Sequence, residues 1–105
     1  MHPNEFGQLL KKYRLSSVDP DSGGKLTQER LAELLDTRAS VIGYSGVRVS
    51  NWERGEEVIG QEKRDLLVGL LLVLHLCREI KTLAEADDLL FSGNYRFLDE
   101  NEAAH

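Results

Sequence analysis

Residues 44–55 read YSGVRVSNWERG, and this stretch decides the fold that we expect. Val49 and Trp52 lie three positions apart, so both would lie on one buried face of a helix. Gly55 follows at the position where a residue with a positive φ commonly ends a helix. The pattern predicts a short helix over residues 45–54, with one face in the core and the other in solvent.

The outward face of this predicted helix carries side chains that suit the edges of bases. Asn can form two hydrogen bonds with adenine, Arg can do so with guanine, and Val can contact the methyl group of thymine. The same residues would also suit a solvated helix surface that has no partner. The residues that the pattern leaves outside or on the flanks are Gly46, Val47, Arg48, Ser50, Asn51 and Arg54.

A second helix start lies upstream, where residues 26–35 read LTQERLAELL. Thr27 can cap this helix and Ser45 can cap the later one, because each side-chain oxygen can accept an otherwise unpaired backbone N–H. The leucines recur at helical spacing, which favours one buried face. The stretch predicts a helix over residues 27–35.

The other apolar residues also recur at helical spacing, and no segment shows a convincing strand pattern. We therefore expect an all-α fold in a single domain over residues 1–105. A helix over 61–81 would be apolar nearly all round, so it would be central in the bundle or form part of a dimer contact. We also predict helices at about 4–15 and 83–91, extended loops at 16–24 and 36–44, and a partly ordered tail at 95–105.

The composition excludes several functional classes. A single Cys excludes an internal disulfide framework and a cysteine-rich zinc site. The longest apolar run, from Leu66 to Cys77, is shorter than the roughly 20 residues that a membrane span needs. The sequence shows no nucleophile–base set, phosphate loop or paired carboxylates. We therefore expect a cytoplasmic protein with no membrane contact, no enzyme activity, no cofactor and no bound metal.

The charge is distributed unevenly along the chain. The formal net charge is −5, which at first argues against a nucleic-acid partner. Residues 1–55 nevertheless hold eight basic and seven acidic residues, whereas residues 56–105 hold five basic and eleven acidic ones. A DNA surface on the first half remains open, and the acidic second half could bind a protein partner.

Together, residues 26–35 and 44–55 resemble the two half-motifs of phage-repressor/Cro-like helix-turn-helix domains, also called the xenobiotic-response-element (XRE) type. The resemblance covers about residues 5–80. It implies a compact five-helix bundle of the lambda-repressor-like type, in which the helix over 45–54 lies in the major groove. It also implies a bacterial or phage-type transcription regulator, such as a repressor, that binds double-stranded DNA as a homodimer. The matching residues are Leu26, Thr27, Gln28, Leu31, Ala32, Ser45, Val49, Ser50, Trp52, Glu53 and Gly55.

The resemblance further implies roles for single residues. Gln28 would contact the DNA backbone and brace the following helix, while Arg14 and Glu53 would form a structural pair. Ser45 lies at a helix start, where backbone N–H groups can bind phosphate. The other implied DNA-binding residues are Gly46, Val47 and Asn51 facing bases, Arg48 beside them, and Arg54 near a phosphate.

A second hypothesis keeps the helix-turn-helix fold but gives it another use. The acidic second half, the long connection over 36–44 and the missing side chain at Gly46 would suit a protein-interaction or self-association module. The segment from Thr82 to Glu102 resembles one that often follows such domains in larger bacterial signalling proteins, of which this chain would be the N-terminal part. Salt dependence distinguishes the hypotheses, because DNA binding weakens steeply as salt rises.

Overall fold

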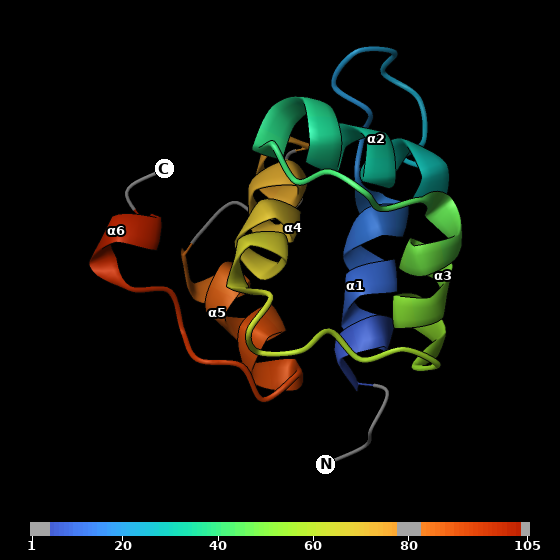
Figure 1. The fold of residues 1–105 in the computed structure, drawn as a ribbon. Helices are drawn as coiled ribbons and strands as arrows, with labels where there is room; N and C mark the ends of the chain where they lie inside the picture. The colour runs from blue at the N-terminus through green and yellow to red at the C-terminus, as the bar shows by residue number, and fades with distance from the viewer. Residues whose placement is uncertain (1–4, 78–82, 104–105) are drawn as a thin grey trace.

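The computed structural model describes residues 5–77 and 83–103, and over this part of the chain the fold is all-α without a β-strand (Figure 1). This confirms the fold class expected from the sequence. The single turn α6, in the tail, was not predicted. The helices are α1 (Glu5–Ser16), α2 (Gln28–Ala39), α3 (Gly46–Arg54), α4 (Arg64–Leu76), α5 (Leu83–Ser92) and α6 (Glu100–Ala103).

The helices pack so that α3 lies at the outside of the bundle. α2 packs against α3 and α4, while α1 packs against α3 and α5. In Figure 1, α3 stands at one side of the molecule and α6 lies at the opposite side. The described part of the tail, up to residue 103, therefore leaves the surface of α3 uncovered.

The core is built mainly from leucines of α2 and α4. Most of α4 is buried within a single copy of the chain. This central position explains why its sequence is apolar nearly all round. Val49 and Trp52 of α3 are 0% and 2% exposed, as their spacing predicted. The largest fully buried side chains are Trp52, Leu10, Leu26, Leu31, Leu34, Leu35, Leu66, Leu67, Leu70, Leu74, Leu89 and Leu90.

α2 is about one turn longer than the sequence predicted, because it continues to Ala39. Asp36 and the residue after it have low intrinsic helix propensity, which favoured an earlier end. Tertiary contacts support the extra turn: Arg38 forms an ion pair with Asp21, 2.7 Å long, in the loop before α2. The connection to α3 is consequently confined to residues 40–45, and the long connection expected over 36–44 is wrong.

α4 also differs from its predicted bounds. It begins at Arg64 rather than at residue 61, because the Lys63 N–H donates to the Gly60 carbonyl at 3.0 Å and closes a turn before the helix. The helix ends at Leu76. The predicted end at residue 81 falls outside the described residues.

The tail begins with a buried tyrosine. Tyr95 is 7% exposed, and its hydroxyl donates a 2.6 Å hydrogen bond to the carbonyl of Ile59. Its ring meets the ring of Phe6 edge-on, with centroids 5.3 Å apart. Burial raises the pKa of the Tyr95 phenol, so the hydroxyl stays a donor. These contacts fix the tail to α1 and to the segment before α4.

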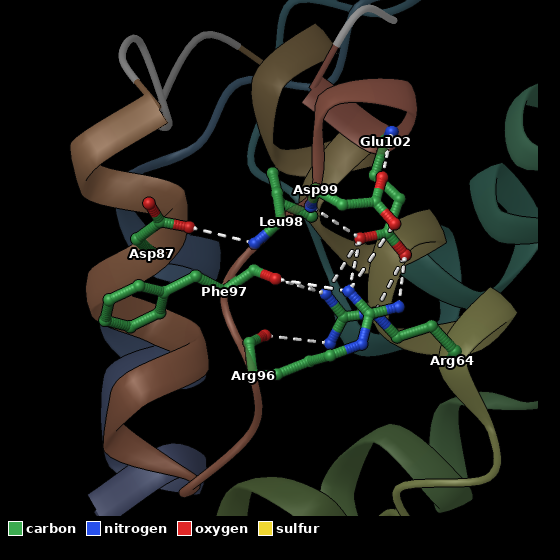
Figure 2. Close-up of polar contacts among 7 residues, drawn as sticks. All are labelled: Arg64, Asp87, Arg96, Phe97, Leu98, Asp99 and Glu102. Atoms are coloured by element: carbon green, nitrogen blue, oxygen red, sulfur yellow. Dashed lines mark hydrogen bonds and ion pairs between the residues drawn. The ribbon is translucent and has the colours of Figure 1, made fainter.

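The rest of the tail is held by Arg64, the first residue of α4 (Figure 2). Its Nε and Nη2 donate to the two carboxylate oxygens of Glu102 at 2.9 and 3.0 Å. Its Nη1 and Nη2 also donate to the carbonyls of Arg96 and Phe97. Asp99 and Glu102 form a reciprocal capping box that starts α6, each side chain accepting the backbone N–H of the other. The Arg64 guanidinium lowers the pKa of Glu102 to about 2.

A Glu102→Gln variant is expected to lose about 1 kcal/mol of stability at neutral pH, because it removes a charge-assisted pair. The pKa of Glu102 is depressed in the folded state, from 4.5 to about 2. Its contribution is therefore full above about pH 4.5 and is lost as the pH falls toward about 2. Urea unfolding should show the difference between wild type and variant shrinking as the pH falls from about 5 to about 2. Glu100→Gln, on the same turn, is the control; an equal loss in both variants would contradict the prediction.

Candidate nucleic-acid interface

α3 buries one face and presents the other outward. Val49, Trp52 and Glu53 form the buried side. At 3.6 residues per turn, four residues fall on the opposite side of the helix. Val47 among them is 69% exposed. The outward residues, called here the α3 face, are Val47, Ser50, Asn51 and Arg54.

A buried carboxylate anchors the inner side of α3 to two other helices. Arg14 of α1 donates to Glu53 through Nε at 2.6 Å and through Nη2 at 3.1 Å. The remaining Arg14 nitrogen donates to the carbonyl of Leu26, just before α2. Gln28 Nε2 donates to Glu53 Oε1 at 2.9 Å. The structure thus contains the Arg14–Glu53 pair that the resemblance implies, and Gln28 braces α3 through the same carboxylate.

Gly46 provides a close approach between α3 and α2. A Cβ at this position would lie 3.0 Å from the backbone N and Cα of Glu29 at the start of α2. Such contacts are tighter than nearly all real Cβ contacts, and backbone atoms cannot easily move aside. Gly46 therefore faces α2 rather than outward. Its lack of a side chain permits the packing of the two helix starts, which the sequence could not show.

The end of α3 turns the chain back along the helix. Gly55 adopts φ 74°, the left-handed conformation that its position predicted. The next two N–H groups, of Glu56 and Glu57, donate to the Asn51 carbonyl at 3.0 and 3.3 Å. This geometry returns two carboxylates to the side of α3, close to Arg48 and Arg54.

Arg48 is bound by groups of the protein itself at the edge of the α3 face. Its Nε donates to Glu57 Oε1 at 2.9 Å, and its Nη2 donates to the other carboxylate oxygen. The guanidinium also lies over the ring of Tyr44, 5.1 Å from the centroid. The hydrogen bonds from Arg48 hold the pKa of Glu57 below its usual value, and the same bonds raise the pKa of Arg48. Both groups are charged at neutral pH, so Arg48 must leave Glu57 before it can offer the same pair of N–H groups to another anion.

Arg54 has weaker contacts than Arg48. One nitrogen, Nη2, donates to Asn51 Oδ1 and to Glu56 Oε2, both at 3.0 Å. The Arg54 and Glu56 side chains are 58% and 61% exposed. Exposed pairs of this kind contribute between about 0 and 1 kcal/mol. A phosphate group could therefore displace Glu56 at little cost.

The starts of α2 and α3 differ in how their N–H groups are capped. Thr27 Oγ1 accepts the Arg30 N–H at 3.0 Å, as predicted. Ser45 occupies the predicted N-cap position of α3, but its side chain makes no capping hydrogen bond within the described part of the chain. Its exposed position leaves the first N–H groups of α3 able to meet a phosphate.

Two residues of this surface were not among the predicted site residues. Ser50, which the helical pattern left outside or on the flanks without a DNA-binding role, lies between Val47 and Arg54 on the α3 face, three and four residues from them. Glu57 lies beyond the helix, and its contact with Arg48 depends on the turn at Gly55. No local pattern indicates such a contact.

Comparisons of the chain with protein-family models, curated proteins and solved structures found no match. Among the described helices, none is long and apolar enough to cross a membrane. Residues 5–77 and 83–103 also contain no group of three or more His, Cys, Asp or Glu side chains that could hold a metal ion.

Proposed function

We propose that this protein is a transcription regulator of the XRE helix-turn-helix type that reads double-stranded DNA with α3. The observation that carries the proposal is the division of α3 into two faces. One face is fixed to α1 and α2 through Val49, Trp52 and the Glu53 carboxylate. The other points outward and carries one apolar, two polar and one cationic side chain, of which Val47 and Arg54 are exposed and the two polar ones are partly buried. A rigidly held helix with such a face suits insertion into the major groove.

Three of the four residues on the α3 face have a DNA contact that their chemistry allows. The Asn51 amide can pair with adenine, and Val47 can contact a thymine methyl group. Arg54 can exchange Glu56 for a phosphate, and the N–H groups after Ser45 can bind another phosphate. Arg48 can bind guanine or phosphate once it leaves Glu57. These groups supply both positioning and base-reading contacts.

We further propose that the protein acts in a bacterial or phage-type cytoplasm as a homodimeric repressor without enzyme activity. Two copies would read half-sites about one helical turn apart, as dimeric helix-turn-helix proteins do. The first half of the chain is only slightly basic, with eight basic and seven acidic residues. Affinity for random DNA is therefore expected to be low, and most of the binding free energy must come from the specific site.

An Asn51→Ala variant is expected to lose about 1–3 kcal/mol of discrimination at one base position, because a bidentate contact to adenine disappears. The measurement is selection of bound sequences from a random duplex pool, followed by fluorescence anisotropy with the selected duplex at two salt concentrations. Wild-type binding should weaken steeply with salt. The variant should bind the selected duplex more weakly and should no longer prefer adenine at that position.

Gln61→Ala is the matched control, because it removes an exposed amide from the turn before α4. It should bind like the wild type. If folded wild-type protein binds no duplex even at low salt, the DNA-binding proposal fails. If Asn51→Ala keeps the full preference for the selected sequence, α3 is not the reading helix.

One observation favours the alternative of a self-association module. Along the outer side of α4, Val68 and Leu72 are only partly buried and Leu76 is 39% exposed. A shallow groove beside them is lined by apolar side chains from the end of α2 and α4, and by the carboxylates of Asp65 and Glu102. An apolar contact between copies at this groove would persist at high salt, unlike DNA binding. Because the DNA-binding proposal also includes a dimer, the two are separated by both properties together: a folded protein that self-associates at high salt in sedimentation equilibrium but binds no duplex at low salt would favour the alternative.

A further inference from the structure

We propose that Glu57 limits the affinity of the protein for DNA by competing with DNA for Arg48. The inference rests on the proposed function, because it requires that α3 meets DNA. In this arrangement Glu57 touches no base. It acts through Arg48, because it sets how favourable the contact of Arg48 with DNA must be before Arg48 leaves Glu57 and binds the DNA.

The geometry makes Glu57 an effective competitor. Its two oxygens accept two nitrogens of the Arg48 guanidinium, which is the same parallel geometry that Arg uses for phosphate or for guanine. The Tyr44 ring beneath the guanidinium holds it in this orientation. The side chains of Arg48 and Glu57 are 39% and 31% exposed, so the pair is accessible to DNA but partly shielded from solvent.

The competition affects random and specific DNA differently. When Arg48 moves to DNA, it exchanges one anionic acceptor for another, and the Glu57 carboxylate is left unpaired beside the phosphate backbone. A random sequence offers few other contacts to offset this cost, so Arg48 remains on Glu57. A specific site forms contacts with Asn51 and Val47 at the same time, and these hold α3 close enough for Arg48 to transfer. Glu57 thereby lowers affinity for the specific site by the full cost of breaking its pair with Arg48, and it lowers affinity for random DNA only by the weaker contact that Arg48 forgoes.

Glu56 provides an internal comparison. It also pairs with an arginine of α3, but through a single nitrogen of Arg54 and with both side chains more than half exposed. Glu56 and Glu57 carry the same charge and are adjacent in the chain. A general effect of negative charge near DNA would therefore appear in both, whereas competition for Arg48 would appear only at Glu57.

The test is a Glu57→Gln variant, measured by fluorescence anisotropy on random and selected duplexes across a salt series. Affinity for random duplex should rise about tenfold, which corresponds to about 1.4 kcal/mol. Affinity for the selected duplex should rise at least as much, because wild-type binding to it includes the cost of breaking the Arg48–Glu57 pair. Because Arg48 then contacts a phosphate in the random complex, the salt slope there should steepen by about 0.9.

The same substitution in an Arg48→Met background separates a positioning role from a charge effect. If Glu57 acts through Arg48, the gain on random duplex should disappear in this background, while the smaller gain from Glu56→Gln should remain. A gain that survives without Arg48, or an equal gain at both glutamates, would overturn the inference and leave the DNA-binding proposal intact. Absence of any binding by the folded wild type would instead defeat the proposed function itself. Circular dichroism and urea unfolding of each variant establish that the proteins compared are folded.

Discussion

A Glu53→Ala variant is expected to unfold with a free energy about 3–5 kcal/mol lower than that of the wild type. The Glu53 side chain is 1% exposed, and it accepts hydrogen bonds from Arg14 and Gln28. Its loss would leave the Arg14 guanidinium, 9% exposed, without its counter-ion in the core. A buried charge without a partner is far more costly than an exposed one. Urea unfolding followed by Trp52 fluorescence measures the difference.

The double variant Arg14→Met/Glu53→Leu shows whether the stability comes from the pair or from avoiding an unpaired charge. An apolar replacement of a buried ion pair is often neutral or stabilising, because neither charge has to be dehydrated. The double variant should therefore recover most of the loss caused by Glu53→Ala. A loss below about 1 kcal/mol in the single variant would mean that Arg14 reaches solvent when its partner is removed.

The parts of the fold that the sequence predicted correctly depend on neighbouring residues. The inward face of α3 follows from the spacing of Val49 and Trp52, and its end follows from the freedom of Gly55 to adopt a positive φ. The start of α2 follows from the hydroxyl of Thr27. Signals of this kind lie within a few residues, so a single sequence is sufficient to detect them.

The parts that were missed depend on residues distant in the chain. The last turn of α2 contains Arg38, which pairs with Asp21 in the loop before the helix. The local sequence alone favoured an earlier end. The turn α6 forms where Glu102 meets Arg64, which lies at the start of another helix. At the candidate interface, the outward residues were predicted from helical periodicity, whereas the pairing of Arg48 with a carboxylate beyond the helix was not. Propensity and periodicity contain no information about such partners.

Gly46→Val is expected to lower the free energy of unfolding by about 1–3 kcal/mol, the usual cost of overfilling a packed contact. A Cβ already lies 3.0 Å from the Glu29 backbone, and the branches of Val would approach further. The start of α3 must therefore move away from α2, while its end stays fixed by Glu53. The resulting tilt of the α3 face should also reduce affinity for the selected duplex by at least about tenfold, or about 1.4 kcal/mol. Urea unfolding and anisotropy measure the two effects separately.

Gly24→Val is the matched control, because a Cβ at Gly24 would meet only the Ser22 hydroxyl, at 3.5 Å. It adds the same side chain to an exposed loop, and both measurements should stay near wild type. If Gly46→Val lowers stability but leaves DNA affinity unchanged, the orientation of α3 relative to α2 does not matter for binding, and the reading surface must be sought elsewhere. If it lowers affinity with little loss of stability, α3 has tilted without unfolding. That second result would identify the Gly46 contact as the element that aligns the α3 face with the groove.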